Sequence, residues 1–388
     1  MNVKHQFKVH HFCNGAVLAF VCLLFVMVLV FSGLVSAFSD VSLFVSGAPN
    51  KVVVSNEVGL RNAVNNAKGS TVIALDKDIQ LTSCLNIPAK KDITLTSNTA
   101  KEFCKLINMV DGSAIFVEAA GVLRLDGIIL AYDEGDWGGV WGGGVCVTLD
   151  GTFIMMDGKI CSRIGGVNNA GTFELQGGII SGCITNGGVY NYGTFTMSGG
   201  EISDNRGDHG GGVHVGPSGS FSMSGGSISG NTADYSGGGV YVDGGSFSMS
   251  SGNIVNNTAN VNGGGVLVVP GGSFSMSGGS ISGNTAEGIG GGVFNSGAFN
   301  RMGGVVSGNT ASNATGDVYT YGNNVDVSVE DSFEGKGDFS TGNESLPDGA
   351  GFSLWEVVVI CAGVGVIEVS VGMAIIFLYV KKRRVPVE

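Results

Sequence analysis

The sequence predicts an all-β solenoid, a fold in which short coils of chain stack on one another. The first observation is a repeat that reads GGGVHVGPSGSFSMSGGSISGNTA from Gly210 and GGGVYVDGGSFSMSSGNIVNNTA from Gly237. A third clear copy, GGGVLVVPGGSFSMSGGSISGNTA, starts at Gly263. A fixed period of this size is typical of repeat architectures. Because one copy is too short to bury a core alone, the copies must stack.

The second observation is a constant offset inside each copy. A phenylalanine opens each FxM-type segment, and an aliphatic residue always stands seven positions after it. The valine upstream stands six to eight positions before the phenylalanine. We therefore expect one corner of the coil to be fixed and another to tolerate insertion. The phenylalanines are Phe153, Phe173, Phe195, Phe221, Phe247, Phe274 and Phe299.

The third observation is an asparagine ten positions after each of the last five phenylalanines. Equivalent residues of neighbouring coils lie about 4.8 Å apart when strands stack in parallel. We therefore expect these side-chain amides to form a structural ladder. The residues are Asn205, Asn231, Asn257, Asn284 and Asn309.

Each copy also carries the local pattern of short strands. In Phe221–Ser224 apolar and polar residues alternate, which is the pattern of a strand with one buried face. Gly-Gly and Gly-Asn pairs separate such segments and supply the conformations that tight corners need. One copy therefore predicts three short strands and three turns.

These repeats resemble the right-handed parallel β-helix of pectate-lyase-like proteins. More narrowly, they are similar to the repeats of polymorphic outer-membrane proteins and adhesin-like surface proteins. GGGV stands where those families carry GGAI, and Ile228–Asn231 and Ile281–Asn284 resemble their FxxN motif with Ile in place of Phe. The resemblance covers roughly residues 142–311 and implies an N-terminal cap. Where the polymorphic family ends in a translocating β-barrel, the C-terminal segment of this sequence predicts a single helix and a basic tail.

We expect the β-helix to span residues 71–330, with degraded early coils before the clear repeats of residues 142–311. Residues 38–70 predict the N-terminal cap. Within them, apolar residues recur at helical spacing over residues 56–67, with Ser55 as the helix N-cap. A short amphipathic helix there would cover the open strand edges of the first coil.

Both ends of the sequence predict contact with a membrane. Residues 1–37 read as a signal peptide that ends at the small-residue site Val35–Ala37, with an uncleaved anchor as the alternative. Residues 354–380 predict a transmembrane helix, and the basic tail of residues 381–388 is expected in the cytoplasm. The Gly-, Ser- and Asp-rich residues 331–353 predict a flexible stalk. We expect a single-pass protein of the cell membrane whose larger part lies outside.

Composition limits the partners. The net charge is −12 and no basic patch interrupts the repeats, which argues against a nucleic-acid partner. Neither a calcium nonapeptide nor a Cys/His pair at metal spacing occurs, so we expect no metal and no cofactor. Cys84 and Cys104 stand about one coil apart, which leaves both a bridge between coils and free buried thiols open.

One segment gathers the residue types of an acid/base site. Asp204, Arg206, Asp208 and His209 stand together, and His214 follows. Neighbouring coils place glycine or asparagine where Asp204 stands, so acids do not accumulate from coil to coil. We therefore interpret the segment as a solvated turn and expect no catalytic residues.

A ligand-binding loop is predicted in the widened interval between Leu123 and Phe153. It combines two tryptophans with three acids, a set that can stack on sugar rings and bind their hydroxyl groups. The alternative is an insertion whose tryptophans pack over the solenoid. The residues are Asp133, Glu134, Asp136, Trp137 and Trp141.

Two functions from different classes remain open. The favoured one is a membrane-anchored, adhesin-like surface protein that binds extracellular polysaccharide or the surface proteins of other cells. The alternative is a membrane-tethered polysaccharide lyase or hydrolase. An exported chain would also expose three glycosylation sequons, at Asn256, Asn313 and Asn343.

Overall fold

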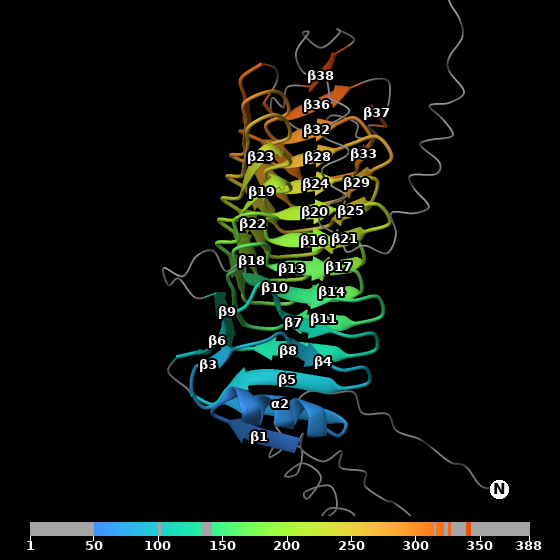
Figure 1. Ribbon diagram of the computed structural model, residues 1–388. Helices are drawn as coiled ribbons and strands as arrows, with labels where there is room; N and C mark the ends of the chain where they lie inside the picture. Colours follow the sequence, from blue (N-terminus) through green and yellow to red (C-terminus); the bar gives the residue numbers. More distant parts are fainter. Residues whose placement is uncertain are drawn as a thin grey trace, which may run out of the picture. The chain divides into compact units, whose positions relative to one another are not determined.

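The computed structural model describes residues 50–99, 102–132, 142–313, 316–321, 325–326 and 339–342. Their strands form four sheets that run along a stack of coils (Figure 1). Each coil contributes one strand to a sheet, and from β2 onward neighbouring strands pair in parallel. The all-β, right-handed parallel β-helix predicted from the repeats is confirmed.

We name the sheets by the residues that recur on their inner faces. The twelve-stranded Phe sheet comprises β1 (Asn50–Val54), β2 (Ser70–Leu75), β5 (Asp92–Ser97), β8 (Val122–Asp126), β11 (Thr152–Met155), β14 (Thr172–Leu175), β17 (Thr194–Met197), β21 (Ser220–Met223), β25 (Ser246–Met249), β29 (Ser273–Met276), β33 (Ala298–Arg301) and β37 (Val325–Asp326). The ten-stranded Ile sheet comprises β3 (Ile79–Leu81), β6 (Cys104–Asn108), β9 (Ile128–Tyr132), β12 (Gly158–Ile160), β15 (Ile179–Ser181), β18 (Glu201–Ser203), β22 (Ser227–Ser229), β26 (Asn253–Val255), β30 (Ser280–Ser282) and β34 (Val305–Ser307).

Two further sheets complete the coils. The eleven-stranded Val sheet comprises β4 (Leu85–Ile87), β7 (Gly112–Val117), β10 (Gly142–Val147), β13 (Val167–Asn169), β16 (Val189–Asn191), β20 (Val213–Val215), β24 (Val240–Val242), β28 (Val266–Val268), β32 (Val293–Asn295), β36 (Val318–Tyr321) and β38 (Phe339–Gly342). The five-stranded Thr-Ala sheet comprises β19 (Arg206–His209), β23 (Thr232–Ser236), β27 (Thr258–Ala259), β31 (Thr285–Ala286) and β35 (Thr310–Ala311).

The Thr-Ala sheet corrects the prediction of three strands per coil, because the coils from Arg206 onward contain a fourth. This strand is as short as Thr258–Ala259. Its alanine is buried and pairs with the alanine one coil away, as Ala259 does with Ala286. Two residues are too few to give the alternating pattern by which a strand is recognised in a sequence.

The predicted helix is present as α2 (Glu57–Asn66), and Leu60 and Val64 on it are fully buried in the core. Its N-cap is Asn56, whose side-chain oxygen accepts a hydrogen bond from the backbone N–H of Gly59 at 2.8 Å. The prediction of Ser55 as the N-cap was therefore wrong by one residue. Asn56 has the extended backbone and the short acceptor side chain that this position favours. That α2 closes the end of the stack stays a prediction.

The core consists of columns of apolar residues, which are largely identical within the clear repeats. Phe221, Phe247 and Phe274 pair directly with one another in the Phe sheet. From Phe153 to Phe299 the rings stack with centroids 4.5–5.0 Å apart and planes within 13° of parallel. Each such pair contributes about 0.5–1.5 kcal/mol beyond the burial of its surface. The repeated phenylalanine therefore both fills the core and favours one register.

A column of buried asparagine side chains runs beside the Ile sheet. The Nδ2 of each asparagine donates to the Oδ1 of the asparagine in the next coil at 2.9–3.0 Å. The same Oδ1 accepts the backbone N–H of the preceding asparagine, and Nδ2 also donates to a backbone carbonyl, as Asn231 does to Ile202. The column ends at Asp317. Its Oδ1 accepts hydrogen bonds from the backbone N–H and from the Nδ2 of Asn309, each at 2.9 Å. A carboxylate suits this end because it only accepts.

Several predicted features lie outside the described residues. They are the signal peptide of residues 1–37, residues 38–49 of the predicted cap, the transmembrane helix of residues 354–380 and the tail of residues 381–388. No helix among the described residues has the length and apolar character needed to cross a bilayer. Strand β38 lies within residues 331–353 and pairs with β36, and the remainder of that predicted stalk is not described.

The asparagine column predicts the effect of Asn257→Ala. The substitution removes the acceptor of two buried donors on Asn231 and the donor to Asn284. We expect a loss of about 3–5 kcal/mol in the free energy of unfolding, because buried polar groups without partners are costly. Denaturant titration measures the loss. Asn253→Ala, at an exposed asparagine four residues away, is the control and should change it by less than about 0.5 kcal/mol. Equal small losses would contradict a structural role for the column.

Candidate functional site

The outer face of the Val sheet differs from the outer face of the Phe sheet. On the Phe sheet, outward positions of successive coils carry Ser222, Ser248 and Ser275. On the Val sheet, the middle residue of each strand points outward and is large in six consecutive coils. We call these residues the outer column: Tyr190, His214, Tyr241, Leu267, Phe294 and Tyr319.

Part of the outer column belongs to a continuous cluster of aromatic and imidazole rings. Within the column, the centroids of Tyr190 and His214 are 4.3 Å apart, and those of His214 and Tyr241 are 5.1 Å apart. His209 joins the cluster from β19, 4.7 Å from Tyr241. We define the ring cluster as Tyr190, Tyr192, His209, His214, Tyr235 and Tyr241.

A bulge between β19 and β23 places the outermost rings. The pairing shifts after Gly207, so that β23 has one residue more than β19 before His209 meets Ser236. A bulge of this kind bends its strand and redirects a side chain. Tyr235 lies in the extra length, stacks on His209 with centroids 5.2 Å apart and is 46% exposed. It is the most exposed ring of the cluster, since the other rings are half-buried or buried.

The chain passes closely over the outer column as it enters the Val sheet. Gly237 has a φ of +71°, and a Cβ added there would lie 2.7 Å from the Cβ of Tyr241. Gly263 stands in the same relation to Leu267. Only glycine fits this turn and this approach. The close passage helps to explain why His214 is only 5% and Leu267 only 4% exposed although both point outward.

Burial controls the charges of the cluster. Desolvation, together with the charge of His209, lowers the pKa of His214 to about 3, although a hydrogen bond with the backbone of His209 acts in the opposite direction. The imidazole of His214 is therefore neutral at neutral pH. Desolvation also raises the pKa of Tyr190, and the hydroxyl of Tyr192 donates to its hydroxyl at 3.0 Å.

One carboxylate borders the rings. Asp243 follows β24, and its Oδ2 lies 4.0 Å from the Nε2 of His214. Desolvation raises the pKa of Asp243, and the charge of His209 lowers it. The nearby guanidinium of Arg206 is bound by Asp234, with an Nη2–Oδ1 distance of 2.8 Å. The cluster thus combines ring faces, phenol hydroxyls and a half-buried acid.

Of the residues that suggested an acid/base site, the structure brings His209 and His214 into one cluster and leaves Asp204 and Asp208 exposed. Asp204 occupies an exposed turn with a φ of 54°, and Asp208 is exposed on β19. The acid that stands beside His214 is instead Asp243, from the next coil. Since a general base works best with a pKa near the operating pH, the strongly lowered pKa of His214 does not suit that role. In the described part of the chain no three potential metal ligands gather.

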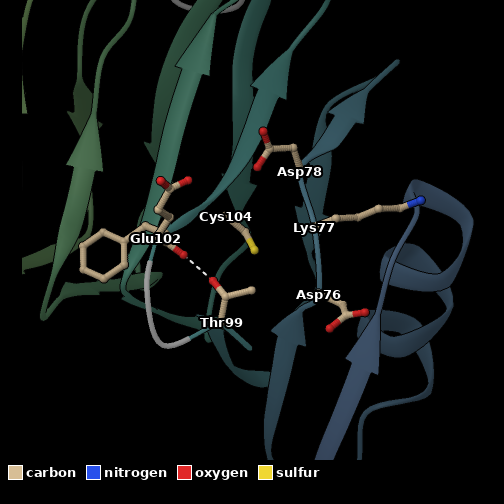
Figure 2. Close-up of a pocket in the computed structure, with 7 residues that line it drawn as sticks. Asp76, Lys77, Asp78, Thr99, Glu102 and Cys104 are labelled. Atoms are coloured by element: carbon tan, nitrogen blue, oxygen red, sulfur yellow. Dashed lines mark hydrogen bonds between the residues drawn. The ribbon is translucent and has the colours of Figure 1, made fainter.

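A pocket lies near the first coils, lined by Asp76, Lys77, Asp78, Thr99, Glu102, Phe103 and Cys104 (Figure 2). Two of its three acids already serve the fold: Asp76 accepts from Asn98 Nδ2 at 3.1 Å, and Asp78 accepts from the backbone N–H of Lys105 at 2.8 Å. Lys77 points away from Glu102 in Figure 2. These groups do not converge on one point, so the ring cluster is the stronger candidate.

The other sequence-predicted positions fall as follows. The loop residues Asp133, Glu134, Asp136, Trp137 and Trp141 lie outside the described residues, between the ends of β9 and β10. Asn256 and Asn313 are exposed, and Asn343 is not among the described residues. Both Cys84 and Cys104 are free thiols, and Cys104 donates to the carbonyl of Leu75 at 3.2 Å.

No protein-family model matches the chain, and no curated protein or solved structure is significantly similar to it.

The buried imidazole predicts a pH dependence of stability. The pKa of His214 is about 3 in the folded chain and near 6.5 in the unfolded chain, so the unfolded state binds more protons between these values. The contribution to stability is complete above the unfolded pKa and is lost as the pH falls toward 3. His214→Tyr, which copies the neighbouring coils, removes this dependence. When the pH is lowered from 7 to 4.5, the free energy of unfolding of the wild type should fall by about 2–3 kcal/mol more than that of the variant. Denaturant titration at the two pH values measures this difference. Parallel losses would contradict the buried neutral imidazole.

Proposed function

We propose that the protein is a non-enzymatic, adhesin-like surface protein that is anchored in the cell membrane and binds extracellular glycans or other cells. The observation that carries the proposal is the ring cluster. Rings such as Tyr235 offer flat apolar faces on which the C–H faces of sugars stack, and polar groups beside them fix the orientation of a ligand. Asp243 and the phenol of Tyr192 are such groups.

The scaffold supports a binding role. Regular coils hold each outward side chain at a fixed spacing from its neighbour. Little conformational entropy is therefore lost when a ligand binds. Hydroxyl and amide side chains occupy most outward positions of the Phe sheet, so the rings stand out from a polar surround. The membrane anchor and the export of the chain rest on the sequence of residues 354–380 and 1–37.

The alternative is a membrane-tethered polysaccharide lyase or hydrolase. The observation in its favour is the approach of His214 and Asp243 to 4.0 Å, since an acid beside an imidazole is a common catalytic pair. Burial opposes this alternative. With a pKa of about 3, His214 is not an imidazolium at neutral pH and so cannot act as a general acid, and its neutral ring is a weak base.

A binding and cleavage assay separates the two functions. The full-length protein is tested against a panel of polysaccharides, with and without calcium, and both retention and chain cleavage are recorded. We expect binding without cleavage. Tyr235→Ala should weaken binding about tenfold by removal of one stacking face. Tyr321→Ala, at a tyrosine of similar exposure at 44%, is the matched control and should leave binding unchanged. Cleavage of any polysaccharide that is lost in His214→Tyr would contradict the proposal.

A further inference from the structure

Asp243 places a carboxylate beside the ring cluster. Its backbone N–H donates to the carbonyl of Val215 at 2.7 Å, which fixes the residue against the preceding coil. No lysine or arginine of the described residues lies within 4.0 Å of its carboxylate. The nearest base is the neutral imidazole of His214, and His209 is the other basic group that faces it. Since no lysine or arginine pairs with it at this distance, the half-buried carboxylate favours a ligand that brings a positive charge.

The rings around Asp243 favour the same charge. The faces of aromatic rings carry negative potential, and they attract ammonium groups within about 6 Å of the ring centroid. Tyr190 and Tyr241 lie on either side of His214 in the outer column, so their rings flank the position that Asp243 approaches. Burial raises the pKa of Tyr190, so its hydroxyl stays a neutral phenol. An anion beside ring faces is the combination that binds alkylammonium groups.

The charge of the whole chain acts in the same direction. Its net charge of −12 attracts cationic polymers and repels anionic ones at long range. Arg206, the basic side chain at the edge of the cluster, is bound by Asp234 and adds no free cation to the site. Uronic-acid polymers would therefore meet like charge both at a distance and at Asp243.

We propose that the ring cluster and Asp243 bind a protonated amine carried by a sugar ring, so that the preferred ligand is an amino-sugar polymer. This inference rests on the proposed function, since it names the substrate class of the same site. The ammonium group pairs with the carboxylate of Asp243, and the sugar stacks on the exposed ring of Tyr235. An acetylated sugar keeps the ring shape and lacks the charge, so it binds more weakly.

Calorimetric titration of the full-length protein tests the inference with three probes at mildly acid pH. The probes are a glucosamine oligomer, an N-acetylglucosamine oligomer of the same length, and choline. We expect the glucosamine oligomer to bind at least about tenfold more tightly than the other two. Asp243→Asn should remove this preference and leave the affinity for the acetylated oligomer within about twofold. Asp126→Asn, at an exposed carboxylate of β8, is the matched control.

A second variant keeps the test decisive if Asp243→Asn fails to fold. Tyr235→Leu retains an apolar side chain and removes the ring, and it should lower the affinity for the glucosamine oligomer about five- to tenfold. The inference would be overturned if the wild type bound both oligomers with equal affinity and Asp243→Asn did not change either affinity. The proposal of glycan binding would still stand. Choline as tight as the glucosamine oligomer would overturn the choice of a sugar. Binding of neither oligomer would also overturn the inference, whereas retention of no polysaccharide of the panel would contradict glycan binding itself.

Discussion

The in-register stacking of coils is the constraint on which the rest of the structure depends. Within a parallel sheet, a shift of one residue turns every side chain to the opposite face. In this chain such a shift would expose the phenylalanine column and bury serine. The asparagine column adds a stricter condition, because each buried amide needs the amide of the next coil as its partner. Identical residues therefore recur at the same place in coil after coil.

The same constraint divides the surface into positions that the fold determines and positions that it does not. Inward residues such as Phe247 and Ile254 are fully buried or nearly so and are repeated with little change. Outward residues face no such requirement. The outer column carries rings in place of small polar residues, and in one coil it carries Leu267. The glycines that pass over the column are nevertheless the same from coil to coil. This is why the outward rings, and not the repeat itself, carry information about a ligand.

Repetition also explains how much of the molecule the sequence predicts. Phe, Ile and Asn columns follow from offsets that never vary, and the structure contains all three. The fourth strand was missed because Thr258–Ala259 is too short to show a period. Asp317 was missed because it ends the asparagine column from a loop that lies outside the repeat. These features occur once or are very short, so periodicity cannot reveal them.

The candidate site was only partly within reach of the sequence. The segment from Asp204 to His214 drew attention for its charged residues, yet the structure brings His209 and His214 to tyrosines instead. Tyr235 reaches the cluster through a bulge, which the sequence does not signal. One signal was available: the residue that follows the first valine of the Val-sheet strand is a ring in three neighbouring coils, at Tyr190, His214 and Tyr241.

Amide hydrogen exchange tests the central role of stacking most directly. The account predicts that the backbone amides of Asn205, Asn231, Asn257 and Asn284 exchange slowly and at similar rates, because each donates to the amide oxygen of the next asparagine. Protection should be matched in the strands of the Phe sheet in the same coils. Fast exchange at the asparagines while those strands remain protected would show that the column does not hold the coils in register.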